Sequence, residues 1–119
     1  MLQSSQDLEP SVKPGWFRVY SETLSNPVVS ITDLQGVVDV CKSHGILSLI
    51  DNTFVSPVLF KPIIFGFYFS IHNAMKYLNG HSDLTAGVIS GPGDLMKIVN
   101  IMAKTLRGNI DPHAAFLLE

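Results

Sequence analysis

The fold is decided by residues 34–51, which read LQGVVDVCKSHGILSLID. Apolar side chains recur there at helical spacing, at Leu34, Val37, Val38 and Cys41. Thr32 is the expected N-cap of this helix, and Gly45 is expected to end it in the left-handed conformation. Residues 46–50 then read as a short apolar strand that ends at Asp51. A helix followed at once by a buried strand is typical of an α/β domain.

The rest of the chain continues this alternation of strands and helices. Residues 1–15 contain prolines and serines without a periodic apolar pattern, so we expect an extended lead-in there. Strands are predicted at residues 16–21, 67–71 and 84–90, a short helix at 57–65, a long helix at 93–107 and the first turns of another helix at 112–119. This order predicts an α/β fold, with a partial, mostly parallel sheet and flanking helices.

The composition of the chain narrows the class of protein. Of the 119 residues, 46% are hydrophobic and only 15% are charged, which indicates a piece of a larger buried assembly or a domain with a covered face. The net charge of −2 offers no basic patch for nucleic acid. The longest apolar stretch, residues 62–69, is far shorter than the roughly 20 residues of a membrane span. We therefore expect a cytoplasmic protein without nucleic-acid or membrane partners.

Polar clusters follow three of the predicted strands, at residues 22–26, 51–53 and 72–76. Ligands of parallel sheets bind beyond the carboxyl ends of the strands, so these clusters form a candidate site. A coincidence of loops is the alternative. Lys76 follows an apolar run and precedes a turn that contains glycine. Such a position suits a partly desolvated lysine whose amine attacks a carbonyl cofactor.

Several other polar and apolar residues have simpler structural interpretations. Cys41 lies on the apolar stripe of a helix and is expected in the core. The apolar stripe of residues 95–106 is expected to be buried in the same way. His81 and Asp83 are interpreted as turn-stabilising groups, because no third ligand is spaced to complete a metal site with them. His72 is expected to be a packing or surface residue.

Three motifs of the chain resemble those of the cysteine/methionine-metabolism family of pyridoxal-phosphate (PLP) enzymes. That family includes cystathionine γ-lyase, cystathionine β-lyase, cystathionine γ-synthase and methionine γ-lyase. The motifs are ETLSNP at residues 22–27, DNTF at 51–54 and KYLNGHSD at 76–83, in the order and at the spacing of the family. The resemblance implies the large domain of the aspartate aminotransferase-like fold. Residues 16–119 would then be a partial PLP-binding domain, truncated at both ends.

The resemblance also implies a role for individual residues. Lys76 would form the internal aldimine with PLP and later move protons at the α and β carbons of the substrate. Asp51 would pair with the pyridine nitrogen, and Asn26 would lie near the phenolic oxygen of the cofactor. Asn73 and Thr53 would complete the cofactor-binding residues. The implied substrate is a sulfur amino acid such as cystathionine, methionine, cysteine or a homoserine ester, and the family is homo-oligomeric.

The chain departs from the family pattern around the lysine. Where the family has serine and threonine hydroxyls that donate to the cofactor phosphate, this chain has Asn73 and Met75. An amide can still donate, whereas a thioether cannot. Losing one charge-assisted hydrogen bond costs about 1.5–3 kcal/mol. An acidic position before the preceding strand is also aromatic here, at Tyr68.

Two hypotheses from different classes remain open on these residues. The first is a PLP-dependent carbon–sulfur lyase or transferase that acts through Lys76. The second is a catalytically inactive, truncated remnant that at most packs against a full-length relative.

Overall fold

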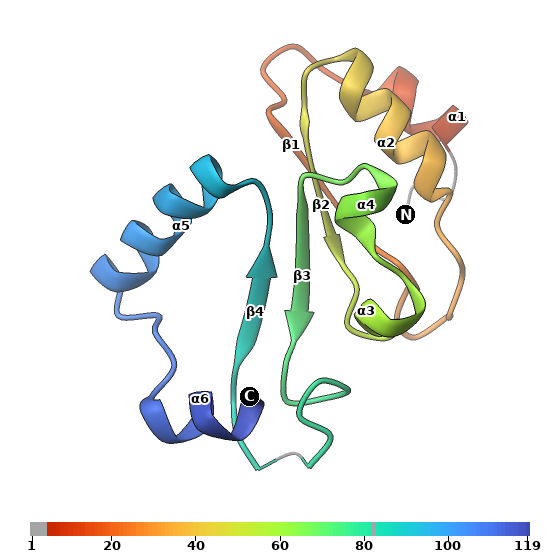
Figure 1. The fold of residues 1–119 in the computed structure, drawn as a ribbon. Helices are drawn as coiled ribbons and strands as arrows, with labels where there is room; N and C mark the ends of the chain where they lie inside the picture. Colours follow the sequence, from red (N-terminus) through yellow and green to blue (C-terminus); the bar gives the residue numbers. More distant parts are fainter. Residues whose placement is uncertain (1–4, 82) are drawn as a thin grey trace.

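The computed structural model describes residues 5–81 and 83–119 and is built around a four-stranded sheet (Figure 1). The strands are β1 (Arg18–Glu22), β2 (Leu47–Asp51), β3 (Phe69–Asn73) and β4 (Gly87–Ser90). They lie side by side in chain order. The first three run parallel, and β4 runs antiparallel to β3. The predicted α/β fold with a mostly parallel sheet is confirmed.

The helices agree with the predicted order but are shorter in places. They are α1 (Ser5–Leu8), the 3₁₀ turn η1 (Glu9–Ser11), α2 (Leu34–Ser43), α3 (Ser56–Leu59), α4 (Pro62–Phe65), α5 (Gly93–Thr105) and α6 (Pro112–Leu118). The short helix predicted at residues 57–65 is divided into α3 and α4. The division is caused by Pro62, which opens α4 and cannot continue a preceding helix. In residues 5–81 and 83–119 no helix has the length and hydropathy to span a bilayer.

The expectation of an extended lead-in over residues 1–15 is wrong for its central part. Helix α1 and the turn η1 occupy residues 5–11, whereas residues 1–4 lie outside the described chain. Leu8 is only 4% exposed and belongs to the core cluster, with Val12 packed against it. Two isolated apolar residues carry no periodic pattern, so only their contacts in the folded chain show that this segment is anchored.

At the N-terminal end of α2 the predicted cap residue is wrong, and at its C-terminal end the predicted glycine is confirmed. Asp33, and not Thr32, is the N-cap, because its side chain accepts from the Gly36 amide at 3.1 Å. The Thr32 hydroxyl instead donates to the Glu22 carbonyl oxygen at 2.8 Å and so ties the helix start to the end of β1. Gly45 follows the helix with a φ of +64°, the left-handed conformation predicted for it.

The core lies between α2 and one face of the sheet. Val38 and Ile50 are fully buried, and Cys41 is 1% exposed, which confirms its predicted place in the core. Burial of an aliphatic side chain of this size stabilises a fold by about 1.5–3 kcal/mol. Helix α2 is thereby held against β2, and the end of β2 carries the central carboxylate of the candidate site.

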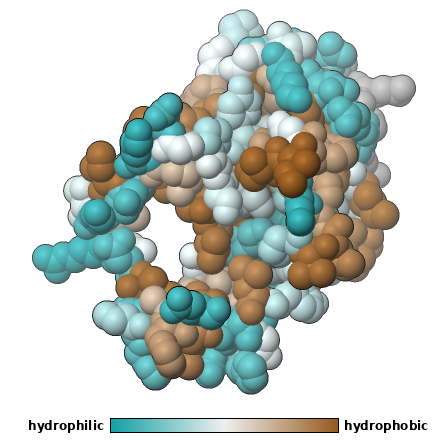
Figure 2. Space-filling model, in the orientation of Figure 1, coloured by the Kyte–Doolittle hydropathy of each residue, from teal (hydrophilic) through white to brown (hydrophobic). Residues whose placement is uncertain are grey.

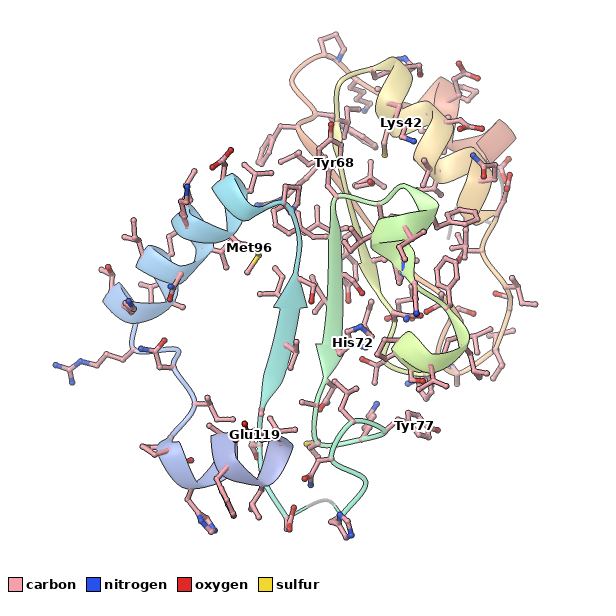
Figure 3. The ribbon with its side chains drawn as sticks, in the orientation of Figure 1. Lys42, Tyr68, His72, Tyr77, Met96 and Glu119 are labelled. Atoms are coloured by element: carbon pink, nitrogen blue, oxygen red, sulfur yellow. The ribbon has the colours of Figure 1, made fainter. Side chains whose placement is uncertain are left out.

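The prediction that the apolar stripe of α5 is buried is wrong. None of the helix's residues is buried, and Ile98 and Met102 are both 56% exposed. Met96 lies on the side of α5 that faces the sheet, as Figure 3 shows. Figure 2 shows open space between the α5–α6 segment and the rest of the molecule. The amphipathic pattern of α5 is therefore real, but no element of the described chain covers its apolar face.

Candidate functional site

The carboxyl ends of β1, β2 and β3 meet at a cavity of about 120 Å³. Its lining residues are Glu22, Leu24, Asn26, Asp51, Thr53, Phe54, Asn73 and Lys76. All five residues predicted from the sequence, Asn26, Asp51, Thr53, Asn73 and Lys76, are among them. Because parallel strands that lie side by side end at the same edge of a sheet, three segments that are well separated in the chain converge there.

Asp51, the last residue of β2, has its carboxylate held on both oxygens. Oδ1 accepts from the Thr53 backbone amide at 2.9 Å and from the Thr53 hydroxyl at 2.5 Å. Oδ2 accepts from the Tyr20 hydroxyl at 3.0 Å. Three donors, two of them side-chain hydroxyls, thus set the orientation of this acidic group in the lining of the cavity.

Thr53 joins the ends of two strands. Its hydroxyl donates to Asp51 on β2 and accepts from the backbone amide of Asn73, the last residue of β3, at 2.8 Å. The side chain is 5% exposed. Because the single hydroxyl proton is already donated to Asp51, the Thr53 side chain has no proton left to donate to a ligand. It instead holds Asp51 and the Asn73 backbone in place.

The turn after β3 carries Asn73 and Lys76. The Asn73 side chain accepts from the Met75 amide at 3.2 Å through Oδ1, and the Lys76 amide donates to the Asn73 carbonyl oxygen at 3.4 Å. Among the described residues, the Asn73 Nδ2 group has no acceptor. The turn therefore leaves an amide donor and a lysine in the lining of the same cavity.

Lys76 is exposed, so the partial desolvation expected for it is wrong for the chain in this structure. Its Nζ lies 4.7 Å from the centre of the Phe54 ring. The Phe54 ring is itself 6.4 Å from the ring of Tyr77, which Figure 3 shows on the turn after β3. A cation over an aromatic face at this distance is attracted by about 0.5–1 kcal/mol at an exposed site. The ammonium is thus held at the cavity by Phe54.

Asn26 reaches the site from the loop after β1. The loop is closed by the bridge between Leu24 and Ile31 and by a 2.7 Å hydrogen bond between the hydroxyls of Ser25 and Ser30. The Asn26-Pro27 peptide bond is cis. Asn26 is exposed and lines the cavity, so its amide is accessible to a ligand.

Three residues of the site were given no role from the sequence, although Glu22 and Phe54 lie within the quoted motifs. Glu22 lies beside Asp51 on the neighbouring strand, Phe54 contacts Lys76, and Tyr20 contacts Asp51. Burial and the nearby carboxylates, Asp51 first and then Glu22, raise the pKa of Tyr20 to about 12. A signal existed for Tyr20, because it stands two positions before Glu22 and therefore on the same face of the strand.

The turn that follows the lysine is confirmed as a structural element. His81 lies with its Nδ1 at 2.9 Å from the Asn79 carbonyl oxygen, and the Asn79 amide donates to Asp83 at 2.6 Å. Ser82, within the same motif, lies outside the described residues. His72 is buried and contacts the Ser70 hydroxyl at 3.0 Å, so it is a packing residue.

The polar groups of the cavity fit PLP by their chemistry. A pyridine nitrogen needs an anionic acceptor, and Asp51 Oδ2 has one lone pair that no described residue occupies. A phenolate oxygen and a phosphate need donors, which the amides of Asn26 and Asn73 supply. A carbonyl carbon needs an amine, which Lys76 supplies. The Met75 side chain has no donor, and Met75 does not line the cavity.

Known proteins share both the sequence and the fold of this chain. It is 36% identical over 116 residues to an L-methionine gamma-lyase of Porphyromonas gingivalis, across 95% of this chain and 29% of that protein. It is 34% identical over 116 residues to a cystathionine gamma-lyase of Bacillus subtilis, across 97% and 31%. The crystal structure of cystathionine gamma-lyase from Lactobacillus plantarum complexed with L-serine matches 98% of this chain with a TM-score of 0.93 at 31% identity.

These proteins are about three times as long as the part they share with this chain, which spans 29–31% of their length. The model of one enzyme family, described as Cys/Met metabolism PLP-dependent enzyme, matches residues 2–119. With the strand-end cavity, the lysine turn and the fold in agreement, the chain belongs to the Cys/Met metabolism PLP-dependent enzyme family.

Proposed function

We propose that this chain forms the PLP-holding part of a carbon–sulfur lyase or transferase that acts on sulfur amino acids. The observation that carries the proposal is the convergence of Asn26, Asp51, Asn73 and Lys76 on one cavity. Relatives that share the family carry the names of cystathionine and methionine lyases, which supports this substrate class.

Each of the four residues has a defined task in the proposal. The Asp51 carboxylate accepts a hydrogen bond from the pyridine nitrogen and keeps that nitrogen protonated. The amide of Asn26 donates to the phenolic oxygen, and the Asn73 amide donates to the phosphate. When bound, PLP supplies an electron sink for the charge that develops at the α-carbon of an amino acid.

Lys76 has two tasks, and its contact with Phe54 affects both. With PLP bound, its amine would be the group that bonds the carbonyl carbon of the cofactor, with loss of water, and that would take and return a proton at the α and β carbons of the substrate. In this structure the Lys76 Nζ lies 4.7 Å from the centre of the Phe54 ring. The amine therefore has to leave the ring before it reaches a bound cofactor.

The decisive experiment tests covalent attachment of PLP at one lysine. The chain is incubated with PLP, the visible absorbance is titrated, and borohydride reduction followed by peptide mass spectrometry locates the modified residue. We expect saturable binding and modification at Lys76, lost in Lys76→Ala and kept in the control Lys104→Ala, which alters an exposed lysine on α5. Modification spread evenly over the lysines, or no saturable absorbance change, would refute the proposal.

A second candidate function is favoured by the exposed apolar face of α5. Ile98, Ile101 and Met102 are each more than half exposed, so this face is available to a partner. In addition, Lys76 is the one basic side chain that lines the described cavity, so no second cation is placed there to bind a phosphate. The chain would then pack against a full-length relative without catalysing a reaction itself. Co-expression with a full-length family member tests this function. A stable complex that is lost in Ile98→Lys supports it, and separate elution of the two chains argues against it.

A further inference from the structure

We propose that Tyr20 is a positioning residue, whose hydroxyl orients the Asp51 carboxylate so that the remaining lone pair of Oδ2 points to the pyridine nitrogen of PLP. This inference rests on the proposed function, because it assigns a task toward the same cofactor. Tyr20 belongs to none of the three family-like motifs and does not line the cavity itself.

The register of the sheet explains how Tyr20 reaches Asp51. On β1 and β2, Tyr20 is opposite Leu49, and Glu22 is opposite Asp51. Side chains alternate between the two faces of a strand, so Tyr20 and Asp51 share one face as diagonal neighbours. An aromatic side chain can span that diagonal. The observed distance of 3.0 Å between the hydroxyl and Oδ2 is a normal hydrogen bond.

One acceptor position of the Asp51 carboxylate receives no hydrogen bond from a described residue. A carboxylate offers about four acceptor positions, two on each oxygen. The Thr53 amide and hydroxyl use both positions on Oδ1. Tyr20 uses one of the two positions on Oδ2. The last position is therefore the one available to the protonated pyridine nitrogen, and Tyr20 decides where it points.

The surroundings of Tyr20 indicate a task other than core packing. Tyr20 is 55% exposed, so it is only partly buried and does not belong to the core. The hydroxyl nevertheless donates to a carboxylate that lies beside a second one, Glu22, on the neighbouring strand. Like charges opposite each other in a sheet are unfavourable, and a neutral donor next to them offsets part of that cost. The Tyr20 hydroxyl is a donor at neutral pH, and partial burial and these carboxylates raise its pKa further, to about 12.

The test compares two ligands and two tyrosine variants. The ligands are PLP and the PLP analogue in which a CH group replaces the ring nitrogen, and their dissociation constants are measured by absorbance titration. We expect Tyr20→Phe to weaken PLP binding about tenfold, as for the loss of an oriented charged hydrogen bond. Binding of the analogue should be unchanged, because its CH group donates no such hydrogen bond to Asp51. Tyr68→Phe is the matched control and should alter neither constant.

The outcomes separate this inference from the proposed function. If the wild-type chain does not bind PLP, both fail. If the wild type binds PLP and Tyr20→Phe weakens both ligands equally or neither, only the role of Tyr20 fails. A double-mutant cycle adds a second readout. In the background of Asp51→Asn, Tyr20→Phe should have no further effect on PLP affinity, and additive losses would overturn the inference.

Discussion

Replacement of Thr53 by valine should lower the free energy of unfolding by about 2–4 kcal/mol, because one hydroxyl serves two strand ends. The change keeps the shape of the side chain and removes the donor to Asp51 and the acceptor for the Asn73 amide. A hydrogen bond to a charged group contributes about 1.5–3 kcal/mol, and a buried amide left without an acceptor costs about 1 kcal/mol or more. Thr53 is 5% exposed, so water replaces these partners poorly.

The assay is urea unfolding followed by far-ultraviolet circular dichroism, with the slope of the transition compared between variants. Thr53→Ser is the matched control, since it keeps the hydroxyl and loses one methyl group, which is worth about 1 kcal/mol. Thr105→Val removes an exposed hydroxyl on α5 and should change stability by less than about 0.5 kcal/mol. Equal losses in Thr53→Val and Thr53→Ser would show that the hydroxyl does not join the two strands.

Three further changes test the packing around the sheet. Gly66→Ala should destabilise the fold by about 1–3 kcal/mol, because the φ of Gly66 is +130° and a new Cβ would lie 2.9 Å from Lys42 Nζ. The control Gly93→Ala places its Cβ in open space and should not destabilise the fold. Equal unfolding midpoints of the two variants would contradict this prediction. Burial lowers the pKa of His72 against the opposing effect of the Asp51 charge. The contribution of neutral His72 to the free energy of unfolding should therefore be fully present above about pH 6.5 and be lost as the pH falls through the lowered pKa of His72. Unfolding curves measured across this pH range should show a weaker pH dependence for His72→Gln. The Ser21 hydroxyl is buried without a partner among the described residues, so Ser21→Ala should leave stability unchanged or raise it by up to about 1 kcal/mol, and a loss in thermal unfolding would argue for a partner.

The candidate site could largely be predicted because its residues stand at strand ends. Asp51 closes an apolar strand, and Lys76 stands on the turn that follows another. Parallel strands bring such ends together whatever the packing beyond them, so their convergence needed only the order of elements. The motif resemblance then named the chemistry, and the cavity contains all five predicted residues.

The parts that could not be predicted depend on partners distant in the chain. The stripe on α5 shows that one helix face is apolar, but it does not show what covers that face, and Ile98 is 56% exposed. Leu8 carries no periodic signal, yet it packs into the core beside α2. Periodicity reports which face of an element is apolar, whereas burial depends on whether another element is positioned to meet it.

The sequence by itself determined the order of strands and helices from β1 onward, the C-terminal limit of α2 and the identity of the residues at the strand ends. These follow from local spacing, capping and turn residues, which act over a few positions. Only the tertiary structure decided that Tyr20 donates to Asp51 and that Thr53 joins two strands. The first contact joins residues 31 positions apart and requires the register of β1 against β2. A slip of one residue would turn Tyr20 to the opposite face, and the register is fixed only when the apolar faces of the strands are buried in the folded chain.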